Sequence, residues 1–144
     1  MNKPAPFSTS ATRALEAIRH FLPRGQYMAL GNLIRQSEER EHYQRLVIST
    51  HEGIASMPAT YDQDGKGDQS VAHLHYTHGG FDFYVTEKDM EGIGTEQVFG
   101  LVSMPPNYPE VGYFNLGEIV AAGAELDLHW TPKTIAECER AAVA

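Results

Sequence analysis

Hydrophobic residues in the first 50 positions recur with the three-to-four-residue period of helices that bury one face. The stripe of Leu15, Ile18 and Leu22 predicts a first helix, which Ser10 would cap and Pro23 would end. Similar stripes predict two further helical segments, either separate or joined as one bent helix, at residues 26–36 and 37–50.

The hydrophobic period changes to two after a polar loop at residues 51–68, as expected for strands that bury one face. The pair Gly79-Gly80 supplies the positive φ angles of a hairpin turn, so the segments on either side of it are predicted to form a β-hairpin. Further strands are expected at residues 96–103, 111–114 and 125–131.

Together these elements predict an α+β fold, with N-terminal helices followed by an antiparallel sheet of about five strands, a short helix and a C-terminal helix. Asn115 is expected to cap the short helix. Thr131 and Pro132 are expected to begin the last helix, because a cap followed by proline is a preferred helix start.

The 144 residues suffice for one domain, with a predicted mobile tail at residues 1–9 and a single domain at 10–144. Within this domain, residues 10–50 would form the helical part and residues 61–132 the sheet part. No apolar run approaches the roughly 18 residues of a membrane span, and Cys138 stands alone, so no intramolecular disulfide is expected. These features favour a cytoplasmic location.

Charge is divided unevenly along the chain, whose formal net charge is −8. Residues 1–50 carry seven basic and four acidic side chains, whereas residues 51–144 carry four basic and fifteen acidic ones. This division favours attraction between the two halves or a different partner for each half. The acidic sheet part would repel phosphate, so a protein partner is favoured there over duplex nucleic acid.

Five sequence blocks between residues 61 and 132 follow one another in the order of a known family: Gln63–Asp68, Phe83–Glu87, Phe99–Val102, Glu110–Leu116 and Glu125–Trp130. Through these blocks the chain resembles the domain-of-unknown-function 2958 family. The resemblance implies an accessory protein of a bacterial plasmid, integrative element or phage, with a role against host defences. It offers no catalytic residues to transfer, and Asp64, Phe83 and Trp130 stand where the family pattern has Glu, Trp and Phe.

Two groups of side chains are candidates for holding a divalent metal. Glu125, Asp127 and His129 would share one face of the last predicted strand, at about 6.8 Å between neighbours. His73 and His75 form a His-x-His pair on another predicted strand. One strand's spacing is too wide for a compact site without ligands from elsewhere, and a solvated sheet face explains both patterns without a metal. No cofactor is predicted.

Glu87 continues the apolar face of the second hairpin arm, so an unbroken strand would point its carboxylate toward the core. A buried carboxylate needs hydrogen-bond donors, and Lys66 or Tyr113 is the expected donor. Glu87 would then serve either as an acid or base in a catalytic site or as half of a structural clasp with Lys66. The clasp is the favoured interpretation.

Three functions follow from these patterns. The leading hypothesis is a non-enzymatic accessory protein that binds another macromolecule, and it rests on the family resemblance, the uneven charge and the lack of a complete catalytic motif. The lysine loop in particular lacks the spacing of a phosphate-binding loop. The second is a small metal-assisted hydrolase, with candidate catalytic residues Lys66, Asp68, Glu87, Glu110 and Tyr113. The third is a sensor that binds a small ligand on its aromatic face.

Overall fold

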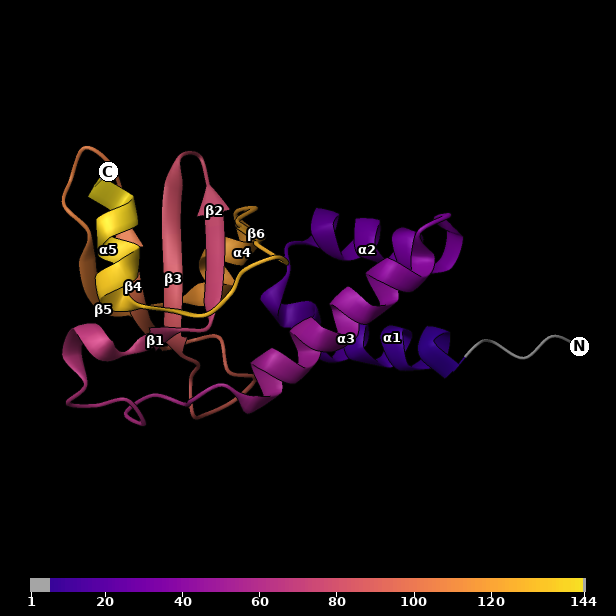
Figure 1. The fold of residues 1–144 in the computed structure, drawn as a ribbon, viewed down its shortest axis with the longest axis horizontal. Helices are drawn as coiled ribbons and strands as arrows, with labels where there is room; N and C mark the ends of the chain where they lie inside the picture. The colour runs from indigo at the N-terminus through magenta and orange to yellow at the C-terminus, as the bar shows by residue number, and fades with distance from the viewer. Residues whose placement is uncertain (1–5, 144) are drawn as a thin grey trace, which may run out of the picture.

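The computed structural model describes residues 6–143, with a helical part at one end of the molecule and a sheet part at the other (Figure 1). The predicted α+β class is confirmed, since N-terminal helices precede a five-stranded antiparallel sheet, a short helix and a C-terminal helix. No helix in this part of the chain is both long and apolar enough to cross a membrane.

The helical part consists of three helices and one 3-10 turn: α1 (Pro6–Ala17), η1 (Arg19–Phe21), α2 (Arg24–Gln36) and α3 (Arg40–Ser56). Helix α1 begins before the predicted cap at Ser10 and so occupies part of the predicted tail, of which residues 1–5 lie outside the described range. Helices α2 and α3 are separate, because Ser37 is extended and its hydroxyl accepts the backbone N–H of Glu39 at 3.0 Å.

The main sheet has the strand order β5–β4–β3–β2–β6, in which every neighbouring pair is antiparallel. Its strands are β2 (Leu74–His78), β3 (Phe81–Glu87), β4 (Val98–Ser103), β5 (Glu110–Phe114) and β6 (Glu125–Leu126). The predicted hairpin is confirmed as the β2–β3 pair. A separate two-stranded ribbon pairs β1 (Val71–Ala72) with β7 (Lys133–Thr134).

The predicted strand at residues 125–131 is wrong beyond Leu126. The Asp127 side chain accepts the backbone N–H of His129 at 3.0 Å, and the Asp127 carbonyl accepts that of Trp130 at 3.3 Å. These bonds close a turn, as aspartate side chains commonly do, and end the strand alternation. Glu125, Asp127 and His129 therefore do not follow one another along a single strand face.

The two short C-terminal elements also test the predicted caps. Asn115 caps α4 (Leu116–Ala121) as predicted, its side chain accepting the backbone N–H of Glu118 at 3.1 Å. The last helix, α5 (Ile135–Val143), begins after the predicted start at Thr131. Its cap is Thr134, whose hydroxyl accepts the Glu137 N–H at 3.3 Å while the Glu137 carboxylate accepts the Thr134 N–H at 3.2 Å.

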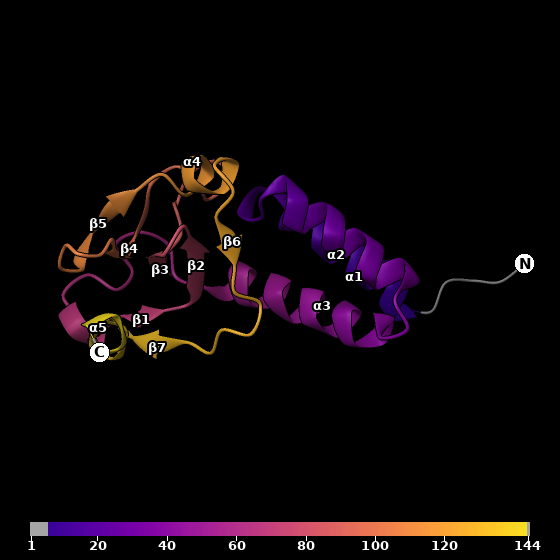
Figure 2. The ribbon, with the colours of Figure 1, turned by 90° about the horizontal axis from the view of Figure 1, so that it is seen from above.

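Figure 2 shows α4 and α5 on opposite sides of the sheet, with the three N-terminal helices beyond its β6 edge. One face packs on the helical part, where Tyr76 is fully buried and donates its hydroxyl to the Phe21 carbonyl at 2.6 Å. The opposite face packs on α5, which buries Tyr84 and Leu101 beside Cys138. Tyr84 alternates with the apolar positions Phe83 and Val85 along the strand, so this second covering layer explains its burial.

The helical part joins the sheet through apolar packing and a paired amide rather than through opposite charge alone. Leu30, Ile34 and Val47 belong to the same buried cluster as the sheet residues. The Gln26 side chain donates to the Leu126 carbonyl at 2.8 Å and accepts the Leu126 N–H at 2.9 Å, which satisfies the outer edge of β6.

Candidate functional site

A cavity of about 420 Å³ opens at the β5 end of the sheet, between the loop at residues 61–70, the end of β3 and α5. Four carboxylates and three aromatic rings contribute to its wall: Asp64, Asp68, Glu87, Glu139, Tyr61, Phe99 and Tyr113. No lysine, arginine or histidine is among the described residues that line it. We call it the acidic cavity.

Glu87 reaches the acidic cavity because strand β3 contains a bulge. Val85 pairs with Gly100, but Glu87 pairs with Phe99, so the register shifts at Thr86. A one-residue shift turns a side chain to the other face of a sheet. Glu87 therefore lies with Phe99 on the α5 face, and the prediction that it continues the face of Val85 is wrong.

Glu87 is 4% exposed, and its carboxylate holds the preceding loop by two backbone hydrogen bonds. Its Oε1 accepts the Gln63 N–H at 2.7 Å, and its Oε2 accepts the Tyr61 N–H at 3.3 Å. Tyr61 has a φ angle of +80°, a strained value for a residue with a side chain. The bond to Glu87 helps to hold that conformation.

Gln63 joins the same loop to the sheet. Its side-chain amide donates to the carbonyls of Val71 at 3.1 Å and Thr86 at 2.9 Å, and its carbonyl oxygen accepts the Val71 N–H at 2.8 Å. With its own backbone N–H bonded to Glu87, this buried residue fixes the loop at three points. This part of the cavity lining is thus held in place before any ligand binds.

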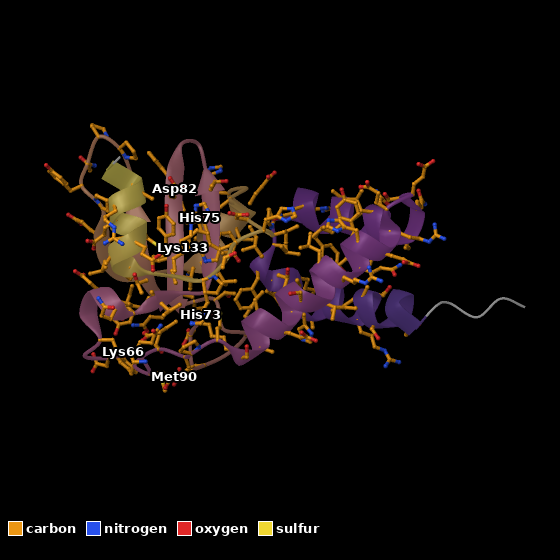
Figure 3. The ribbon with its side chains drawn as sticks, in the orientation of Figure 1. Lys66, His73, His75, Asp82, Met90 and Lys133 are labelled. Carbon is orange, nitrogen blue, oxygen red and sulfur yellow. The ribbon has the colours of Figure 1, made fainter. Side chains whose placement is uncertain are left out.

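The predicted clasp between Lys66 and Glu87 does not form in the described structure. Lys66 is exposed, does not line the cavity and makes no ion pair with Glu87 among residues 6–143. Figure 3 shows Lys66 on the outer loop, well apart from His75. The donors to Glu87 are backbone N–H groups, which the identity of the side chains nearby does not reveal.

The aromatic wall is a chain of ring contacts. The Tyr61 and Tyr113 ring centroids are 6.3 Å apart, and those of Phe99 and Tyr113 are 4.9 Å apart in an edge-to-face arrangement. Partial desolvation raises the pKa of Tyr113, and the neighbouring Tyr61, Glu87 and Asp64 raise it further. The phenol of Tyr113 is therefore neutral near pH 7.

A second polar cluster surrounds His75 on the α5 face of the sheet. His75 Nε2 lies 2.7 Å from Asp82 Oδ1, and His75 Nδ1 lies 3.1 Å from Asp127 Oδ2. The ring stacks on Tyr84 at 4.7 Å and contacts Trp130 at 4.9 Å. Figure 3 shows Asp82 and His75 together, with Lys133 nearby. Both ring nitrogens are occupied, so this cluster ties the 127–133 segment to the sheet.

None of the predicted metal ligands forms a compact site. Within residues 6–143, no group of three or more His, Cys, Asp or Glu side chains could hold a metal ion. The two carboxylates beside His75 lie at opposite ring nitrogens, so they cannot share one ion with it. His73 is half-buried, and desolvation lowers its pKa, which keeps the ring neutral.

The residues predicted as catalytic or metal-binding candidates lie mainly in two separate cavities. Asp68, Glu87 and Tyr113 line the acidic cavity, whereas Lys66 and Glu110 do not. Glu125, Asp127 and His129 line a different cavity of about 460 Å³ between β6 and helices α2 and α3. The hydrolase candidates are thus only partly brought together.

The sequence patterns missed several residues of the acidic cavity, notably Gln63, Phe99 and Glu139. One signal was available in Gly100, since glycine inside a strand often marks a bulge or a close backbone approach. A Cβ atom at Gly100 would overlap the carbonyl oxygen of Tyr84. This close approach lies beside the bulge that turns Glu87 into the cavity.

Fold and site together define an α+β protein with an acidic, aromatic-walled cavity at one end of its sheet. Comparisons of the chain with protein-family models, curated proteins and solved structures give no match. The resemblance to the domain-of-unknown-function 2958 family therefore stays a prediction.

Proposed function

We propose that this protein is a non-enzymatic accessory protein of a bacterial mobile element and acts by binding a protein partner at the acidic cavity. The observation that carries the proposal is the cavity itself, whose wall, as far as the structure describes the chain, combines carboxylates and aromatic rings without a basic residue. Such a wall repels phosphate and leaves nucleic acid a poor ligand.

Exposed apolar side chains around the cavity mouth support a protein as the partner. Tyr61, Val111 and Tyr113 are 57%, 54% and 48% exposed, although each is large and apolar. Aromatic side chains are enriched in protein interfaces and dominate their binding energy. Strand β5, which carries two of these residues, is an edge strand of the sheet.

The mobile-element part of the proposal, including a role against host defences, rests on the family resemblance. Four of the five blocks that carry the resemblance contribute residues to the acidic cavity: Gln63–Asp68, Phe83–Glu87, Phe99–Val102 and Glu110–Leu116. These blocks are far apart in sequence and meet at the cavity. A shared binding site explains why they would occur together.

Affinity capture with the full-length chain tests the proposal. We expect a specific host protein to be retained by the wild type and lost with Tyr113→Ala, which removes an exposed ring at the cavity mouth. Met28→Ala is the matched control, because Met28 is similarly exposed, at 54%, but lies on α2 in the helical part. Equal retention by both variants would contradict binding at the cavity.

A further inference from the structure

We infer that the acidic cavity binds a cationic side chain of the partner, a lysine ammonium or an arginine guanidinium. The inference rests on the proposed function and gives the chemistry of its central contact. Three features lead to it: a buried carboxylate that makes no ion pair within residues 6–143, an aromatic wall, and further carboxylates in the cavity lining.

The first step concerns the charge balance of Glu87. Glu87 is more than nine-tenths buried, and the hydrogen bonds that its carboxylate accepts within residues 6–143 come from two backbone N–H groups. An ionised carboxylate can accept about four hydrogen bonds, so its capacity is not filled by these two. A buried charge is costly without an opposite charge, which a cationic group entering the cavity would supply.

The second step concerns the aromatic wall. Tyr61, Phe99 and Tyr113 form one continuous wall of ring contacts. Ring faces attract a cation that lies within about 6 Å of the centroid, and the attraction grows when the cation is desolvated. Asp64, Asp68 and Glu139 also line the cavity and would attract a positive charge from solution.

Two other ligands fit the geometry less well. A hard metal ion needs several oxygen ligands around one point, and no suitable group of three side chains exists in the described part of the chain. A peptide strand added to the β5 edge would lie three strand spacings, about 14 Å, from β3 and Glu87. That distance exceeds the reach of a four-carbon lysine stem, so the side chain enters through the cavity mouth.

Titration of the ¹⁵N-labelled full-length protein with short peptides tests the inference. The probes are acetyl-Gly-Lys-Gly-amide and acetyl-Gly-Arg-Gly-amide, with the uncharged N-ε-acetyl-lysine peptide as control. We expect the amide signals of Tyr61 and Gln63 to shift, because their N–H groups bond to Glu87. At least one cationic peptide should bind saturably, with a dissociation constant of about 1 mM or lower. Its affinity should fall at high salt, because salt screens the attraction between opposite charges.

Substitutions separate the contributions of the buried charge and of the aromatic ring to peptide binding. Glu87→Gln removes the buried charge and should weaken peptide binding about tenfold or more. Tyr113→Leu keeps apolar bulk but removes the ring, and should weaken it about threefold. If Glu87→Gln fails to fold, Tyr113→Leu and Glu139→Gln decide the question, with Met28→Ala expected to bind as the wild type does.

The inference is overturned if the acetylated peptide binds as tightly as the lysine peptide, or if neither cationic peptide gives a saturable shift at about 10 mM. Unchanged affinity in the cavity variants would also overturn it. Loss of the captured partner with Tyr113→Ala, in the absence of peptide binding, would overturn this inference but leave the proposed function standing. If the cationic peptides bind but Tyr113→Ala and Met28→Ala capture the partner equally well, the proposed function is overturned and this inference stands.

Discussion

Replacement of Glu87 by alanine should release the loop at residues 61–63 from the end of β3. The carboxylate accepts the buried Gln63 N–H at 2.7 Å and the partly buried Tyr61 N–H at 3.3 Å. A hydrogen bond to a charged group contributes about 1.5–3 kcal/mol, and the longer bond belongs at or below the low end. We therefore expect Glu87→Ala to lower the free energy of unfolding by about 2–4 kcal/mol.

Urea denaturation followed by circular dichroism measures this loss, and amide hydrogen exchange at Tyr61 and Gln63 locates it. Glu87→Gln should cost less, about 1–2 kcal/mol, because its carbonyl oxygen can still accept the Gln63 N–H. Glu110→Ala is the control: this exposed carboxylate on β5 should change stability by less than about 0.5 kcal/mol. If Glu87→Ala is as stable as this control and the two amides keep their protection, the assigned role is refuted.

Three further changes probe the packing around the sheet. Tyr76→Phe leaves the buried carbonyl of Phe21 unpaired and should cost about 1–3 kcal/mol in urea denaturation; an unchanged midpoint would contradict the bond. Gly100→Ala places a methyl group against a backbone carbonyl of β3 and should cost about 2 kcal/mol or more. Gly112→Ala, with open space around its Cβ, should cost much less, and equal losses would refute the steric reason. Burial raises the pKa of Cys138 from 9.0 to about 11, so the thiol ionises first in the unfolded state and stability should fall between pH 9 and 11. Cys138→Ala should flatten that fall in urea titrations at several pH values, and an unchanged slope would exclude the thiol as its source.

Local patterns predicted the elements whose stability depends on near neighbours. The β2–β3 hairpin follows from the glycine pair, whose φ angles are +57° at Gly79 and +83° at Gly80. The Asn115 cap follows from a side chain that bonds its own backbone a few residues on. Each depends on groups that lie within a few residues of one another along the chain.

Elements that depend on distant partners were predicted less well. Alternation continues from Glu125 to Trp130, yet only Glu125 and Leu126 find a partner strand, in β2. Beyond them, Asp127 bonds to His75, and Trp130 donates its indole N–H to the Ala72 carbonyl at 3.0 Å. These contacts favour a turn over a strand, and no local pattern reports them.

By itself the sequence determined the fold class and placed carboxylates and aromatic residues in blocks that could meet. The tertiary structure decided which of them meet. A bulge at Thr86 turns Glu87 to the α5 face, and the loop that carries Tyr61 and Gln63 provides its donors from the backbone. Strand periodicity alone cannot show a one-residue shift, because the shift depends on how β3 packs against Gly100 of the neighbouring strand.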